Sequence, residues 1–442
     1  MKLSILTAPV VSLVVVSMPV LGQDAGRIDA AFDRFWFADS TSQARGRIDD
    51  IVDLGISFEE AFERLRQGRR YESEDSGTIR RSYRGEDGVE YYYDLNIPDS
   101  YDPSRQYQVR FQLHGGVGGR TSNQPRGNGE VRIPGAEQIY IVPYSWNSAP
   151  WWGDAQVENL RVILDEVKRD YNVNENRVVV SGVSDGGTGA YFIGMRETTR
   201  FASLLPLNAF IMVLTNPAID DGRSFPENLR NKPLFVINGG RDRLYPTSNV
   251  GPFVRYLSDH GVETAYYPQP EGEHNTRWWP EMRDTFEQFV SVHVREPHPD
   301  SITWETGEGR HNRAHWLVIE DLDDEQKSDT PMADMNLVGE TRELNQFIRP
   351  GGSIFPRAGD SGRVDVHREG NTIRATTDGV GSFRLLLSPD VFDLDARVEV
   401  IANGTVVFDG DVAEDVGTLL RWAAQDNDRT MLYGAELKIR LD

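Results

Sequence analysis

The sequence predicts an α/β protein in which a mostly parallel β-sheet carries helices on both faces, with a small helical segment before it and an antiparallel β-domain after it. Three observations support this. From about residue 138 to residue 294, strand-like and helix-like segments alternate. Short strands such as Val178-Val179-Val180 are apolar throughout, which is typical of strands buried on both faces. After Pro297 and Pro299, short strands of alternating polarity replace this alternation.

The composition excludes several classes of protein. The chain has 442 residues, with 47 Lys and Arg against 69 Asp and Glu, a formal net charge of −22, and no cysteine. Disulfides, thiolate metal sites and a cysteine nucleophile are therefore excluded. The acidic balance argues against nucleic acid or an anionic membrane as a partner, because both are bound mainly through Lys and Arg.

Residues 1–22 have the pattern of an export signal. Lys2 precedes an apolar run over residues 5–16, and the chain becomes polar directly after Gly22. We expect cleavage after Gly22, a secreted or periplasmic protein, and no stable membrane insertion after cleavage. A retained anchor is the alternative, although two prolines interrupt a run that is short for about 30 Å of hydrocarbon.

The mature chain divides into three expected parts. Residues 23–75 form a helical prefix, in which Ser57 and Glu60 have the spacing of a helix cap. Residues 76–295 form the α/β domain, and residues 296–442 form the antiparallel β-domain, where Asn403-Gly404 predicts a two-residue hairpin turn. Within the α/β domain, strands are expected at residues 89–95, 108–113, 138–143, 177–181, 204–207, 233–238 and 263–267. Helices are expected at residues 155–171, from 185 onward, at 250–260 and at 278–294.

A serine motif follows a buried strand and precedes a helix pattern. In Gly182-Val183-Ser184-Asp185-Gly186, the serine would occupy a tight strand-to-helix turn that exposes its hydroxyl at the carboxyl edge of the sheet. A serine hydroxyl needs a base, which in turn needs an orienting carboxylate, each after a later strand. Asp242 and His274 stand at those places, in that order. We predict a catalytic triad of Ser184, Asp242 and His274.

A glycine-rich segment after an earlier strand predicts an oxyanion hole. His114-Gly115-Gly116 lies where a backbone N–H could face the reacting carbonyl oxygen, and the amide of Asp185 would supply the second donor. The first donor could be the amide of Gly115 or that of Gly116. Alternatively, the glycine-rich segment has a structural role only.

These motifs together resemble the α/β-hydrolase superfamily, and within it the secreted esterases of the feruloyl-esterase and polyhydroxyalkanoate-depolymerase type. The resemblance spans about residues 80–295 and is carried by 114–116, 182–187, 239–242 and 273–274. It implies an eight-stranded sheet and an acyl-enzyme mechanism without a cofactor. The chain is also similar to the catalytic domains of prolyl-oligopeptidase-like peptidases, but the N-terminal segment is too short for their β-propeller, which favours an esterase.

Other features carry weaker hypotheses. Trp146, Trp151, Trp152, Trp278 and Trp279 follow strands at the expected catalytic edge, and we expect Trp146 and Trp278 to contact substrate unless they are core residues. The acidic stretch 321–329 lacks the glycine and glutamate of a calcium loop, and His311 and His315 lack a third ligand, so no metal site is expected.

The sequence thus predicts an exported serine hydrolase that cleaves a small-molecule or polymer ester, such as a polysaccharide ester. A serine peptidase and a non-catalytic carbohydrate-binding protein are the alternatives. The role of the β-domain, whether support, polysaccharide binding or oligomerisation, is left open, as is the oligomeric state.

Overall fold

A computed structural model describes residues 21–72, 74–122, 137–216, 218–219, 221–307, 309–323, 355 and 359–441. The expected export signal therefore lies, apart from its last two residues, outside the described part of the chain. None of the helices among the described residues is long and apolar enough to cross a membrane.

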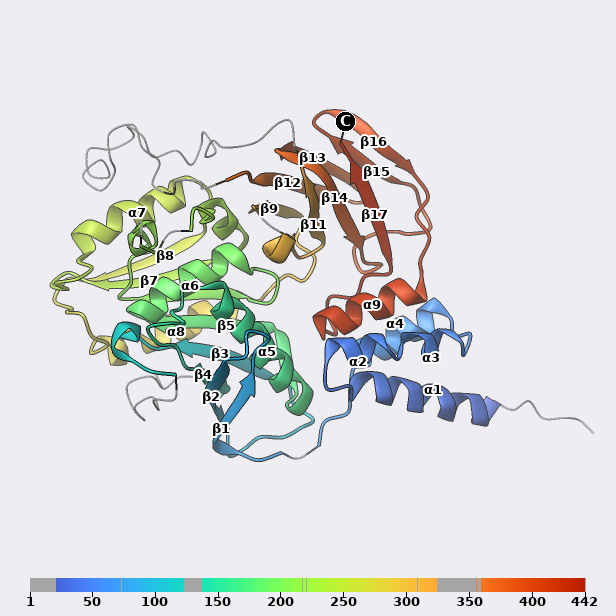
Figure 1. Ribbon diagram of the computed structural model, residues 1–442, viewed down its shortest axis with the longest axis horizontal. Coiled ribbons are helices and arrows are strands. Elements are labelled where there is room, and N and C mark those ends of the chain that lie inside the picture. Colours follow the sequence, from blue (N-terminus) through green and yellow to red (C-terminus); the bar gives the residue numbers. More distant parts are fainter. Residues whose placement is uncertain are drawn as a thin grey trace, which may run out of the picture.

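An eight-stranded sheet forms the framework of the larger, left-hand part of the molecule in Figure 1, with the strand order β1-β2-β4-β3-β5-β6-β7-β8. β1 and β2 pair antiparallel, as do β2 and β4, and all the other pairs are parallel. The strands are β1 (Gly77–Arg84), β2 (Glu90–Ile97), β3 (Tyr107–Leu113), β4 (Ile139–Pro143), β5 (Val173–Val183), β6 (Ser203–Leu207), β7 (Leu234–Gly239) and β8 (Thr264–Gln269).

Helices cover both faces of this sheet. Val178 and Val180 of β5 belong to the apolar cluster that includes helices α5, α6 and α7, whereas Val179 packs in a second cluster with helix α8. Successive side chains of a strand point to opposite faces, so each face of β5 has its own helical layer. The helices are α5 (Asp154–Asp170), α6 (Asp185–Arg196), α7 (Thr247–Asp259) and α8 (Trp279–Val292), with the short 3₁₀ turns η1 (Val117–Gly119), η2 (Ile211–Thr215) and η3 (Pro226–Asn231).

Two smaller sheets follow, as the change of pattern after residue 296 predicts. One has the order β10-β11-β14-β17 and the other β16-β15-β13-β12-β9, and their buried side chains share one apolar cluster. The pairing of β13 with β15 is parallel, so this region is not antiparallel throughout. The elements are β9 (Ser301–Thr306), η4 (Gly309–His311), β10 (Arg313–Ala314), β11 (Leu317–Leu322), β12 (Gly362–Glu369), β13 (Thr372–Asp378), β14 (Val380–Leu387), β15 (Val398–Ala402), β16 (Thr405–Gly410) and β17 (Ala435–Arg440).

The N-terminal helices pack against a helix from the far end of the chain. They are α1 (Leu21–Trp36), α2 (Thr41–Arg45), α3 (Ile48–Val52) and α4 (Phe58–Gln67), and their partner is α9 (Val416–Asp426) (Figure 1). Leu419, Leu420 and Ala423 of α9 are fully buried in the cluster that these helices form. Helix α9 is absent from the sequence prediction, and it gives the prefix the apolar partner that the short helices need. The boundaries at residues 75 and 295 stay predictions.

Candidate active site

Ser184 lies on a strained turn between β5 and α6. Its backbone angles, φ 58° and ψ −120°, belong to a region that residues with a Cβ rarely adopt. Ser184 N donates to Leu207 O at 2.9 Å and Thr188 N donates to Ser184 O at 3.0 Å, so β6 and the first turn of α6 hold this conformation. A Cβ at Gly182 would lie 2.1 Å from Gly186 O, which explains the glycine at position 182.

The loops that follow β7 and β8 pack directly on each other. Arg241 N donates to Gly272 O at 2.9 Å, and a Cβ at Gly239 would lie only 2.3 Å from the same oxygen. Glycine at position 239 therefore lets the two backbones approach closely. This contact brings a carboxylate after β7 next to a histidine after β8.

Asp242, His274 and Ser184 form one hydrogen-bonded row. The Asp242 side chain is fully buried, and its Oδ1 accepts from the amides of Leu244 at 2.8 Å and Tyr245 at 3.0 Å. Its Oδ2 lies 2.7 Å from His274 Nδ1, and His274 Nε2 lies 2.8 Å from Ser184 Oγ. Because a carboxylate accepts, Nδ1 carries the imidazole proton and Nε2 faces the hydroxyl as an acceptor. In this arrangement His274 Nε2 can accept the proton of the Ser184 hydroxyl.

Serine, carboxylate and histidine thus follow β5, β7 and β8 at the carboxyl edge of a mostly parallel sheet, the arrangement that defines one large superfamily. The chain has the α/β-hydrolase fold. The predicted fold class, with a helical prefix and a C-terminal β region added to this α/β-hydrolase core, is confirmed.

The loop after β3 lies over the serine. A Cβ at Gly115 would be 3.0 Å from Ser184 Cβ and 3.6 Å from Ser184 Oγ. His114 Nε2 accepts from Ser145 N at 3.0 Å, so Nδ1 carries the proton and donates to Gly115 O at 2.9 Å. Because the C=O and N–H of a trans peptide point in opposite directions, this bond turns the Gly116 N–H away from His114.

Asp185 connects this loop to the serine turn. It is the first residue of α6, whose initial amides have no partner within the helix, and its Oδ2 accepts from Val117 N at 2.9 Å. The structure therefore places the loop with Gly115 and Gly116 next to Ser184 and bonds it to Asp185, the third residue predicted for an oxyanion hole. Their role as donors stays a prediction.

The tryptophans expected to contact substrate are buried. Trp146 is 4% exposed and packs on Tyr91, while Trp278 is 6% exposed and packs beside Trp279 in the α8 cluster. Little surface of either ring is left for a substrate, which argues against the aromatic-wall hypothesis for both. Trp151 is fully buried too, and its Nε1 donates to His114 O at 2.7 Å.

Two further residues shape the site and are missing from the sequence prediction. Asn208 is fully buried, has a φ of 46°, and donates from Nδ2 to Asn275 O at 2.8 Å, directly beside His274. The ring of Tyr245 packs edge-on against the His274 imidazole, with 5.5 Å between ring centres. Burial raises the pKa of Tyr245, and the nearby Asp185 and Asp242 carboxylates raise it further. Asn208 could have been identified from the sequence by its place directly after an apolar strand.

The histidines considered for metal binding have other partners. His311 Nε2 lies 3.1 Å from an Asp154 oxygen, and His315 Nε2 lies 3.0 Å from Lys232 Nζ, which is not a metal ligand. No group of three potential ligands was found in the described part of the chain. Most of the acidic stretch 321–329 lies outside the described residues.

Comparisons with known proteins find esterases at low identity, and no model of a protein family matches the chain. The probable feruloyl esterase C of Aspergillus terreus is 25% identical over 188 residues, which are 40% of this chain and 65% of that protein. Feruloyl esterase C of Emericella nidulans is 27% identical over 157 residues, 34% of this chain and 57% of that protein. The matches thus span between 57% and 65% of the length of these curated relatives, less than two thirds of either.

The similar solved structures include both esterases and peptidases. A ferulic acid esterase of Anaeromyces mucronatus is 15% identical with a TM-score of 0.40, covering 51% of this chain and 94% of that one. The acylaminoacyl peptidase of Pyrococcus horikoshii is 14% identical with a TM-score of 0.40, covering 51% of this chain and 44% of that one.

Proposed function

We propose that this chain is an exported serine hydrolase that cleaves carboxylic esters through an acyl-enzyme. Ser184 is the nucleophile, His274 the general base and Asp242 the carboxylate that orients it. The observation that carries the proposal is the row of hydrogen bonds of 2.7 Å and 2.8 Å that joins these side chains. The strained backbone of Ser184 supports it, because such strain is typical of functional positions.

The geometry supports a two-step reaction. Ser184 Oγ attacks the ester carbonyl carbon while its proton passes to His274 Nε2, and the Asp185 amide and a Gly115 or Gly116 amide stabilise the oxyanion. The intermediate collapses, the C–O bond to the alcohol breaks, and the alcohol leaves with the proton from His274. A water molecule then gives a proton to His274 and attacks the acyl carbon. The bond from that carbon to Ser184 Oγ breaks, the acid leaves, and Oγ takes the proton back from His274. No step requires a cofactor.

Esters of ferulic acid are the first substrate class to test. Both curated relatives described above carry the name feruloyl esterase C, and their matches include only part of each protein. The alcohol part would be a small molecule or a polymer such as a polysaccharide.

A substrate panel tests the activity. Purified protein is assayed with feruloyl, acetyl, uronoyl and hydroxyalkanoate esters and with peptide anilides, with Ser184→Ala as the matched control. We expect ester turnover that the control lacks, with feruloyl esters among the substrates. Peptide turnover alone would identify a peptidase, and glycan binding without any turnover would identify a binding protein. Either result would overturn the proposal.

We also propose that the protein is exported to the periplasm or the medium. Lys2 and the apolar run over residues 5–16 support export. Mass spectrometry of the protein recovered from the periplasm or medium should show a mature chain that begins at Gln23. An intact N-terminus on membrane-bound protein would contradict export with cleavage.

A further inference from the structure

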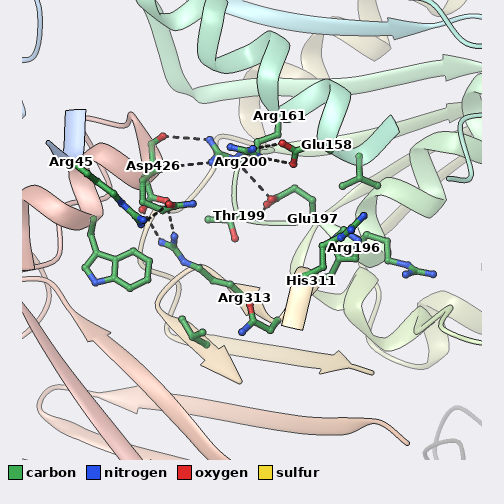
Figure 2. A pocket seen from close by; sticks show the side chains of 16 residues that line it. Arg45, Glu158, Arg161, Arg196, Glu197, Thr199, Arg200, His311, Arg313 and Asp426 are labelled. Atoms are coloured by element: carbon green, nitrogen blue, oxygen red, sulfur yellow. Dashed lines mark hydrogen bonds and ion pairs between the residues drawn. The ribbon is translucent and has the colours of Figure 1, made fainter. Parts of the chain in front are cut away.

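Charged side chains gather around a cavity between the α/β-hydrolase core and helix α9 (Figure 2), and most of them have partners within the protein. Arg313 donates to both oxygens of Asp426 at 2.6 Å and 2.8 Å, and Arg161 pairs with Glu158. Such paired groups have little capacity left for a ligand. A polar group without a partner lies elsewhere, beside the proposed catalytic residues.

This group is the hydroxyl of Tyr245, whose backbone is fixed by two buried residues. Asp242 Oδ1 accepts from Tyr245 N at 3.0 Å, and Asn238 Nδ2 donates to Tyr245 O at 3.4 Å. Asn238 belongs to β7 and is fully buried, and Asp242 also bonds to His274. The position of Tyr245 is therefore tied to that of the proposed base.

The Tyr245 ring contacts both His274 and the loop that follows β6. Its centre lies 5.5 Å from that of the His274 imidazole and 6.2 Å from that of the Phe210 ring. Phe210 is buried in the main apolar cluster, and Tyr245 packs against this cluster while part of its surface stays exposed. The exposed part lies beside the imidazole that faces Ser184, where an ester has to bind.

The Tyr245 hydroxyl has no hydrogen-bond partner within the described part of the chain, where only the backbone N–H and C=O of Tyr245 form such bonds. Burial raises the pKa of Tyr245, and the Asp185 and Asp242 carboxylates raise it further. The hydroxyl therefore keeps its proton and can donate it in a hydrogen bond. Because Asp185 directly follows Ser184, its effect indicates that the hydroxyl is close to the serine turn.

The two oxygens of the ester group have other partners in the proposed mechanism. The carbonyl oxygen faces the Asp185 amide and a glycine amide, and the alcohol oxygen receives its proton from His274. The Tyr245 hydroxyl is thus left for a further oxygen atom of the substrate. The nearby carboxylates repel an anion, which favours a neutral hydroxyl group, and a hydroxyl can both donate to and accept from a phenol.

We propose that Tyr245 is a specificity-determining residue, whose hydroxyl forms a hydrogen bond with a hydroxyl group of the substrate close to the scissile ester bond. This role depends on the proposed esterase function and narrows its substrates to esters of hydroxy acids or of alcohols with a second hydroxyl group. A site that binds a substrate hydroxyl discriminates against the analogue without it, because the hydroxyl of the protein is then left unpaired.

Two pairs of esters test this role, and within each pair a methyl group replaces a hydroxyl. The 2-hydroxyethyl and propyl esters of one acid differ in the alcohol part, whereas methyl 3-hydroxybutyrate and methyl 3-methylbutyrate differ in the acyl part. The measured quantity is the ratio of kcat/KM within each pair. We expect wild-type protein to prefer the hydroxyl ester about fivefold in at least one pair, which then shows the part of the substrate that Tyr245 contacts.

Tyr245→Phe removes only the hydroxyl and keeps the ring against His274, so the ratio in that pair should fall to about one. Tyr266→Phe is the matched control, because it removes another hydroxyl without a partner, which lies beside Gly251 of α7. The control should keep the wild-type ratio.

A wild-type ratio of about one in both pairs would overturn the role of Tyr245 and leave the esterase function standing. So would a preference that persists in Tyr245→Phe, including one that persists because both esters of a pair become slower by the same factor. An equal loss of the preference in Tyr266→Phe would also overturn it. If wild-type protein hydrolysed no ester at all, the proposed function would fall together with this role.

Discussion

A single methyl group added at Gly115 should block the reaction while leaving the fold intact. In Gly115→Ala, the new Cβ would lie 3.0 Å from Ser184 Cβ, closer than the usual 3.5–4.0 Å between carbon atoms, and 3.6 Å from Ser184 Oγ. The loop or the serine must therefore move by several tenths of an ångström. The methyl group would also take up space within 3.6 Å of Oγ, the atom that a carbonyl carbon has to approach to about 3–3.5 Å.

The size of the effect follows from this geometry. A misplacement of about 1 Å in an active site costs roughly a hundredfold in rate, which corresponds to about 2.7 kcal/mol of transition-state stabilisation. We expect kcat/KM of Gly115→Ala, measured on the best ester of the substrate panel, to fall by about that factor. The folded protein should lose no more than about 1–3 kcal/mol from the closer packing.

Gly118→Ala is the matched control. It adds the same methyl group three residues further along the loop, where the new Cβ would have no neighbour within 4 Å, so kcat/KM should not change. If Gly115→Ala retained activity within about threefold of wild type, or if both variants lost activity equally, the placement of Gly115 over the reacting atoms would be refuted.

Three other predictions concern the site and the pH dependence of stability. Asp242→Asn should lower kcat by about 10³-fold or more with little change in Tm, because an amide cannot stabilise the imidazolium of His274; activity near wild type would contradict this. Asn208→Ala removes the donor to Asn275 O and should lower kcat about tenfold, whereas an unchanged kcat with a lower Tm would show a merely structural role. Burial lowers the pKa of His298 to about 4, below its usual 6.5. His298 thus stays neutral in the folded state while the unfolded state binds a proton, so stability falls by about 3 kcal/mol as the pH drops from 6.5 to 4. Denaturant unfolding across that range should show a smaller fall in His298→Leu, and an identical fall would refute the assignment.

The central sheet and the serine turn could be predicted because their signals are local. The apolar strand before Ser184 and the glycines around it determine both the turn and the exposure of the hydroxyl. Asp242 and His274 could be placed near it because parallel strands end at one edge of a sheet, although the contact between their loops depends on the close approach at Gly239.

Long-range packing could not be predicted in the same way. The pattern of the N-terminal helices shows an apolar face but not its partner, which is α9, more than 340 residues away. Trp146 and Trp278 follow strands that end at the edge of the sheet near Ser184, as expected, yet their rings are buried in apolar clusters. The position of a residue along the chain does not determine which way its side chain points. Asn208 acts through a bond to the backbone of a loop that is 67 residues distant.

Covalent labelling of the nucleophile tests the central claim most directly. A fluorophosphonate probe is incubated with wild-type protein and with Ser184→Ala, and the modified peptide is identified by mass spectrometry. The proposed mechanism predicts one adduct, on Ser184 in wild type, and neither labelling nor ester turnover in the variant at an unchanged Tm. An adduct on another serine, or ester turnover that persists in Ser184→Ala, would contradict it.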